Sequence, residues 1–161
     1  MWDCKELSAK ALTYDIDNEE QCRLDFVQET VPLKEMSFRL EGKEPAACSI
    51  AWLPTDNNQF VVGYEDGHVV LFNYKTGTVQ QAVMVHPSPI VSVVAHFYEP
   101  VVVCGHLDGQ ISWFDFKAQK KVYSADCKSP VQTLALMNNC LNVVAGLSCG
   151  SIKLFDMKGQ V

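Results

Sequence analysis

The stretch GHLDGQISWFDFK, residues 105–117, occurs in variant form at two other places in the chain. GYEDGHVVLFNYK occupies residues 63–75 and GLSCGSIKLFDMK occupies residues 146–158, so the first glycines are 42 and then 41 residues apart. All three copies share glycine at positions one and five, Phe at position ten and Lys at position thirteen. A period in this range indicates one structural unit repeated in tandem, which decides the fold before any single residue does.

The pattern within each copy is typical of a β-hairpin. In the first copy, apolar runs at residues 59–64 and 68–74 flank an Asp-Gly step, where glycine accepts the positive φ that a tight turn needs. A further apolar run precedes each hairpin and a weaker one follows the first two, so each full unit is predicted to contain four strands. The joins carry prolines, which cannot donate to a strand ladder, at nearly the same period: Pro45, Pro87 and Pro130.

The predicted strands are apolar on both faces. In residues 110–116, Ile111 and Trp113 point one way, while Phe114 and Phe116 point the other. A sheet buried on both faces fits a propeller blade between two neighbours better than a solenoid, whose repeats of this length are usually helical or have shorter rungs. The predicted core places three Phe residues at equivalent interior positions with four large residues near them: Phe72, Phe114 and Phe155, with Trp52, Leu71, Trp113 and Leu154.

The units resemble WD repeats over roughly Pro45 to Val161, with a hairpin of the type Gly-x-x-Asp-Gly-x-Ile-x-x-Phe-Asp. The resemblance implies an all-β fold of propeller blades, each with four antiparallel strands. The three recognisable units are residues 45–86, 87–128 and 129–161, the last without its outer strand. A closed propeller typically has four to eight blades. We therefore predict part of a larger or incomplete propeller; the alternative is a four-blade ring that uses the N-terminal residues.

In this family, a His before the first strand, a Ser or Thr in the second, an Asp in the turn and a Trp in the third form a hydrogen-bonded tetrad. The second unit has His86 and Asp108 at the matching positions, but Cys104 replaces the hydroxyl and Phe114 replaces the Trp. The third unit has Cys149 in place of the Asp. These departures imply blades that depend on packing more than on the polar network.

Residues 1–44 lack the glycine signature. Met1 to Asp3 resembles the end of a third strand of a preceding blade, and three further strands are predicted at residues 11–17, 22–28 and 36–41, with an acidic run at residues 15–20. We interpret the segment as the end of a preceding blade plus an acidic insertion or a degenerate blade. Residues 11–17 alternate correctly to pair with residues 151–157, whose exposed edge would otherwise favour self-association.

Composition is that of a globular protein: 161 residues, 48% hydrophobic, with a net charge of −6. This charge predicts no attraction to nucleic acid, and the absence of an apolar run of roughly 18 residues predicts no membrane insertion. The start of the chain has no hydrophobic stretch of the signal-peptide kind. Seven cysteines, an odd count without Cys-x-x-Cys, favour reduced thiols. We predict a cytoplasmic location, with the nucleus as the alternative.

The sequence offers no converging catalytic set. Asp66 and Asp108 occupy equivalent turns on separate predicted blades, and a general acid–base pair would need both carboxylates in one cleft. His86 lies at a blade join, and the other three histidines are interpreted as loop or strand-edge residues: His68, His96 and His106. Zinc would need further ligands at close spacing. We therefore predict no enzyme activity, no cofactor and no metal.

The resemblance implies a non-catalytic scaffold that presents loop surfaces to other proteins; the alternative is an enzyme or a small-ligand or metal-binding module carried on a propeller. In the family, partners commonly dock on the face that carries the hairpin turns and the loops between blades. Seven residues map to that face: Glu65, His86, Ser88, Leu107, Lys128, Ser129 and Ser148. The expected partners are other proteins, together with self-association through open blade edges or a larger parent protein.

Overall fold

The computed structural model describes residues 35–137 and 141–156, all within one compact unit, Glu35–Val161. These residues form eleven strands and no helix. The strands are β1 (Ala47–Trp52), β2 (Gln59–Tyr64), β3 (His68–Asn73), β4 (Thr78–Met84), β5 (Ile90–Ala95), β6 (Val101–His106), β7 (Gln110–Asp115), β8 (Lys120–Asp126), β9 (Val131–Leu136), β10 (Asn142–Leu147) and β11 (Ile152–Asp156).

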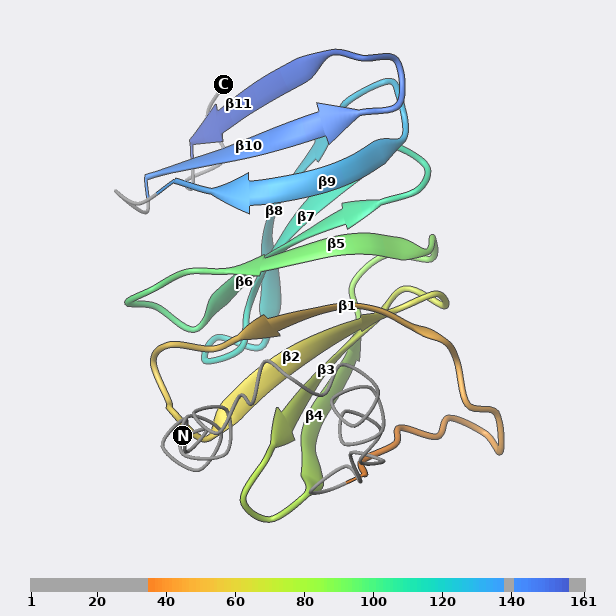
Figure 1. Ribbon diagram of the computed structural model, residues 1–161, viewed down its shortest axis with the longest axis vertical. Helices are drawn as coiled ribbons and strands as arrows, with labels where there is room; N and C mark the ends of the chain where they lie inside the picture. Colours follow the sequence, from red (N-terminus) through yellow and green to blue (C-terminus); the bar gives the residue numbers. More distant parts are fainter. Residues whose placement is uncertain (1–34, 138–140, 157–161) are drawn as a thin grey trace, which may run out of the picture. The chain divides into compact units, whose positions relative to one another are not determined.

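The strands form three antiparallel sheets in which each strand pairs with its neighbour in the sequence. Blade 1 has the order β1-β2-β3-β4, blade 2 has β5-β6-β7-β8, and blade 3 has β11-β10-β9. Figure 1 shows the blades in succession, and the inner strands β1, β5 and β9 contact one another in that order. The all-β fold class is therefore confirmed, with sheets consistent with propeller blades and not closed into a ring.

The glycine of each repeat forms the hairpin turn that the sequence predicts. Gly67, Gly109 and Gly150 have φ of 88°, 93° and 82°, a region that side-chain-bearing residues rarely enter. In each turn the glycine N–H donates to the carbonyl of the residue three positions earlier, for example Gly67 to Tyr64 O at 3.1 Å. The repeated glycine thus fixes the same turn three times.

Two apolar clusters hold the three blades together. Val69 and Leu71 of blade 1 pack with Val93 and Phe114 of blade 2, and a second cluster joins blade 2 to blade 3 around Trp113. The predicted interior positions of the three Phe residues are confirmed, because each is buried: Phe72, Phe114 and Phe155. Because neighbouring blades bury the strands on both faces, the strands carry apolar residues in both directions.

The prediction that Trp52 and Leu154 belong to the core is wrong. Trp52 and Leu154 are each more than half exposed. Trp52 packs edge-on against Phe60 and Tyr74 within blade 1, with ring centroids 5.8 Å apart in both pairs. Leu154 points away from blade 2. Both side chains lie on faces that no described blade covers, so repeat symmetry alone overestimated their burial.

The predicted strand at residues 36–41 is also wrong, since this segment forms only an isolated bridge between Leu40 and Lys43. Phe38 is nevertheless buried, because it packs on Val62, Tyr64 and Phe72 of blade 1. The other predictions for the N-terminal segment fall on residues 1–34, outside the described residues: the third-strand end at residues 1–3, the strands at residues 11–17 and 22–28, and the acidic run.

Strand β11 lies at an edge of its sheet within the described part of the chain. Its pairing with residues 11–17 stays a prediction, as do the unit boundaries at residues 44, 86 and 128. No helix in residues 35–137 or 141–156 has the length and apolar character that crossing a lipid bilayer would require.

Candidate functional site

Each of the three hairpin turns lies beside the segment that leads into the inner strand of its own blade, because the same backbone bond repeats in all three blades. The residue two positions before the turn glycine donates its N–H to a carbonyl just ahead of the inner strand: Glu65 to Ala46 at 3.0 Å, Leu107 to Pro89 at 2.9 Å and Ser148 to Pro130 at 2.9 Å. The blades thus gather all seven predicted site residues in turns and joins at one end. We call this end the turn face; it comprises residues 65–67, 86–89, 107–109, 127–130 and 148–150.

Four of the predicted residues are exposed on the turn face: Glu65, Leu107, Lys128 and Ser148. Leu107 is a large apolar side chain held on a tight turn and half-exposed to solvent. Lys128 has a positive φ of 59°, and its N–H donates to Asp126 Oδ1 at 2.7 Å while its ammonium contacts Oδ2 of the same carboxylate. The face therefore presents acidic, apolar, basic and hydroxyl groups at positions fixed by backbone bonds.

The polar pair that the resemblance implies is formed in blade 2. His86 Nε2 lies 2.6 Å from Asp108 Oδ2, and the Asp108 carboxylate also accepts the Gln110 N–H at 3.1 Å. Partial burial acts to raise the pKa of Asp108, but the hydrogen bonds from His86 and Gln110 outweigh it, so this pKa lies below its ordinary value. Cys104, at the hydroxyl position, is fully buried, and burial raises its pKa to about 12.

His106 is a buried histidine that the sequence analysis placed at a strand edge. Its ring lies 4.9 Å from that of His86, its Nδ1 lies 3.2 Å from Ser88 O, and its Nε2 has no hydrogen-bond partner. Burial lowers the pKa of His106 to about 4, so the ring is neutral at pH 7. The repeats carry a signal for this burial, because the equivalent residues, Tyr64 and Leu147, are apolar and also buried.

Ser88 is buried beneath the turn face, although the sequence predicted it on the surface. Its hydroxyl accepts the Asp108 N–H at 3.3 Å, and its carbonyl faces His106. Ser88 therefore supports the Asp108 turn from below. In blade 3, where Cys149 replaces that Asp, the Ser129 and Ser148 hydroxyls lie 3.1 Å apart.

Cys149 is an exposed thiol at the tip of the β10–β11 turn. Hydrogen bonds with Ser129 and Ser151 lower the pKa of this thiol to about 7. A thiolate at this turn would carry the negative charge that Asp66 and Asp108 supply in the other two blades. The blade 3 turn therefore carries a partly ionised thiol near neutral pH, where the other two turns carry a carboxylate.

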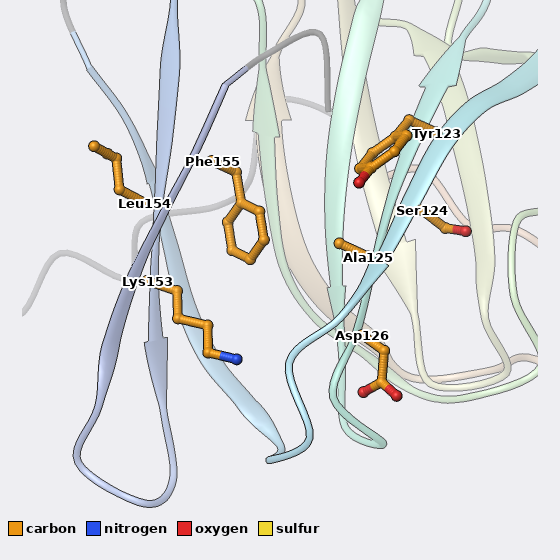
Figure 2. A pocket seen from close by; sticks show the side chains of 7 residues that line it. All are labelled: Tyr123, Ser124, Ala125, Asp126, Lys153, Leu154 and Phe155. Carbon is orange, nitrogen blue, oxygen red and sulfur yellow. The ribbon is translucent and has the colours of Figure 1, made fainter. Parts of the chain in front are cut away.

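A hollow of about 570 Å³ lies between β8 and β11, lined by Tyr123, Ser124, Ala125, Asp126, Lys153, Leu154 and Phe155. Figure 2 shows Lys153 and Phe155 directed toward β8, with Leu154 directed away from it. Lys153 Nζ donates to Cys127 O at 2.9 Å, which ties blade 3 to the join that follows blade 2. The hollow has a lysine and a carboxylate near one end and aromatic rings beside them, without a nucleophile and base in contact.

Within residues 35–137 and 141–156, no group of three or more His, Cys, Asp and Glu side chains is placed to hold a metal ion. The two close His–Asp pairs are His68 with Asp66 and His86 with Asp108. Each His–Asp pair joins a turn to its blade, and His86 of the second pair also faces the buried ring of His106. The geometry of the described residues therefore supports presentation of a surface.

The fold and the site together define an all-β repeat protein. Its antiparallel sheets carry equivalent hairpin turns at one end. No family model matches the chain. Over 129 residues the chain is 25% identical to Striatin-4 of Mus musculus, a match that covers 77% of this chain and 17% of that protein. The chain thus spans a minor part of the length of this relative.

Proposed function

We propose that the chain is a non-catalytic scaffold of WD-like repeats that binds other proteins through its turn face. The observation that carries the proposal is the common placement of exposed Glu65, Leu107 and Ser148, each fixed by a backbone bond to the segment just ahead of the inner strand of its own blade. Side chains held on a rigid frame lose little conformational freedom on binding. The similarity to Striatin-4, a WD-repeat protein, supports the same class of function.

The chemistry of the turn face favours a protein partner. Leu107 offers an apolar contact near the centre of the series, and Lys128 and Glu65 offer charges of opposite sign around it. Interfaces of this kind have an apolar centre with a polar rim. Free thiols at Cys48, Cys104, Cys127 and Cys149 support a reducing compartment, and we propose the cytoplasm as the place of action.

We expect the double variant Leu107→Asp, Lys128→Glu to lose partners that the unaltered chain captures from a cell extract. The change places a carboxylate at the apolar centre and reverses one rim charge, so we expect at least about a tenfold loss of affinity for the recovered partner, equal to about 1.4 kcal/mol. Both side chains are exposed, so the melting temperature should stay nearly unchanged. Binding is measured with the purified partner after its identification by mass spectrometry.

The matched control is Tyr98→Asp with Lys117→Glu, the same two chemical changes on exposed residues in the connections β5–β6 and β7–β8 at the other ends of the strands. This control should keep full binding. Equal binding by both double variants would reject the turn face as the interface. Recovery of no protein partner by the unaltered chain would contradict the scaffold function itself.

A further inference from the structure

The interface between blades 1 and 2 is built around a glycine and a hydroxyl that face each other. Ser49 in β1 pairs with Gly63 in β2. The Val93 N–H of blade 2 donates to Ser49 Oγ at 3.0 Å. A Cβ at Gly63 would lie only 2.5 Å from Ile90 Cγ2 and 2.7 Å from Val93 Cγ2. The inner strand of blade 2 therefore fits onto blade 1 only because residue 63 has no side chain. We call this glycine–hydroxyl pair a seat.

The interface between blades 2 and 3 repeats the construction with different side chains. Ser92 pairs with Gly105, and the Leu134 N–H donates to Ser92 Oγ at 3.0 Å. A Cβ at Gly105 would lie 2.6 Å from Val131 Cγ1 and 3.2 Å from Leu134 Cγ. In both interfaces, the inner strand of the next blade places two apolar residues, three positions apart in the sequence, against the glycine of the seat.

Blade 3 has a third seat that no described residue occupies. Thr133 pairs with Gly146, and a Cβ at Gly146 would meet only the Thr133 methyl group, at 3.0 Å. Beside this seat, Ile152 is 76% exposed, whereas its equivalents Val69 and Ile111 are fully buried. The residues match by register, since each pairs with the seat glycine of its own blade.

Leu154 shows the same contrast. It is 54% exposed, while its equivalents Leu71 and Trp113 are 6% and 1% exposed beneath the following blade. Figure 2 shows Leu154 on the side of β11 that faces away from β8. Blade 3 thus has both the seat and the apolar side chains beside it, Ile152 and Leu154, and no described residue covers either.

Strand β1 carries the side chains that fill a seat. By register, Ala47 and Ile50 occupy the positions of Ile90 and Val93 in β5. Both are exposed, Ile50 to 65%. Phe38 packs over β2 and β3 of blade 1 and leaves these two side chains of β1 open. Among the described residues, the seat on blade 3 is therefore empty and no seat receives strand β1 of blade 1.

We propose that the seat of blade 3 binds strand β1 of a second copy of this chain. In this contact, Thr133 Oγ accepts the Ile50 N–H of the second copy. Ala47 and Ile50 of that copy lie over Gly146, and its strand β1 covers Ile152 and Leu154. A second copy fits this seat because the contact repeats an interface already made twice within the molecule. The seat of blade 3 is a surface other than the turn face and is not part of the proposed function.

Such an association is head-to-tail, because one copy contributes its seat and the other its strand. Head-to-tail contacts generate rings where the rotation closes and open chains where it does not. Two copies with three described blades each would bring six blades together, which lies within the usual four to eight of closed propellers. A dimer is therefore the expected closed product.

Sedimentation velocity over a wide concentration range tests the proposal. The unaltered chain should show a reversible, concentration-dependent dimer. Ile152→Lys, which damages the seat, and Ile50→Lys, which damages the strand, should each weaken dimerisation at least about tenfold, because a lysine would be buried without a partner. Val122→Lys is the matched control, since Val122 on the outer strand β8 is also more than half exposed, and it should dimerise normally.

Mixing the two damaged variants distinguishes this interface from any other. The Ile50→Lys chain keeps its seat and the Ile152→Lys chain keeps its strand, so one of the two contacts is intact in a mixed pair. The mixture should therefore form an open heterodimer through that contact, which neither variant forms alone. Gly146→Ala provides a second seat variant that adds no charge and should also abolish the dimer, with circular dichroism confirming the fold. A monomeric unaltered chain would overturn the proposal, as would dimers that survive in the single variants or a mixture that stays monomeric.

Discussion

Replacing Phe114 with alanine is expected to lower the free energy of unfolding by about 3–5 kcal/mol, because truncating a large buried ring removes its packing and leaves a cavity. The Phe114 side chain is 3% exposed and packs in the cluster between blades 1 and 2. Its ring meets that of Phe116 edge-on, with centroids 5.2 Å apart. Both blades close around this ring, which leaves little room for the cavity to collapse.

Urea unfolding of the purified variant measures the loss. Val122→Ala is the control, because it truncates an exposed apolar side chain on the same blade and should cost less than about 1 kcal/mol. A loss below about 1 kcal/mol for Phe114→Ala would mean that the ring does not hold the blades together.

Acid should destabilise the fold well above the pH at which carboxylates protonate. Unfolded His106 takes up a proton near its ordinary pKa of 6.5, whereas burial lowers the folded pKa to about 4. Because the unfolded state binds more protons within this window, stability present above pH 6.5 is lost as the pH falls toward 4. Each pKa unit corresponds to 1.36 kcal/mol, so the loss approaches about 3 kcal/mol.

The pKa of His106 depends on groups from several elements. Burial and the nearby charges of His86 and Lys121 lower it, while the Ser88 carbonyl and Asp108 raise it. Asp108 acts in a separate window, because its lowered pKa makes its contribution disappear only at still lower pH.

The pH dependence is measured by urea unfolding at a series of pH values between 7 and 4, compared with His106→Leu. The variant should lose most of the slope in this window, whatever its stability at pH 7. Val103→Ala is the control, because it truncates another fully buried residue of β6 without removing a titrating group and should leave the slope intact. An unchanged slope in His106→Leu would show that another group titrates.

The sequence predicted the hairpins and the three interior Phe residues because they depend on bonds and contacts within one repeat. A glycine at a positive-φ turn is a local requirement, so Gly67 and Gly109 could be placed from the repeat alone. The burial of a side chain cannot be predicted from its own repeat when it depends on a neighbouring blade. Leu154 has the same local pattern as Leu71, yet only Leu71 has a described blade packed over it.

The candidate site was predictable in part for the same reason. His86 and Asp108 were matched by position within a family pattern, and the structure brings them to 2.6 Å. The burial of His106 was not predicted, because histidine is a polar residue type. The equivalent residues in the other repeats, Tyr64 and Leu147, indicate a buried position. Ser88 was placed on the surface because a proline-flanked serine is typical of a loop, and its burial depends on the fold of the whole join.

Successive repeats pack on one another as blades, and this packing predicts different losses for Gly67→Ala and Gly150→Ala. The two variants are compared by urea unfolding at a dilution at which the chain is monomeric. Both glycines have positive φ, but a Cβ at Gly67 would lie 1.9 Å from the His86 carbonyl oxygen at the join to blade 2, whereas nothing lies within 4 Å at Gly150. We predict a cost of about 1–2 kcal/mol for Gly150→Ala from φ alone and a clearly larger loss for Gly67→Ala. Equal losses would contradict the packing of blade 2 on blade 1.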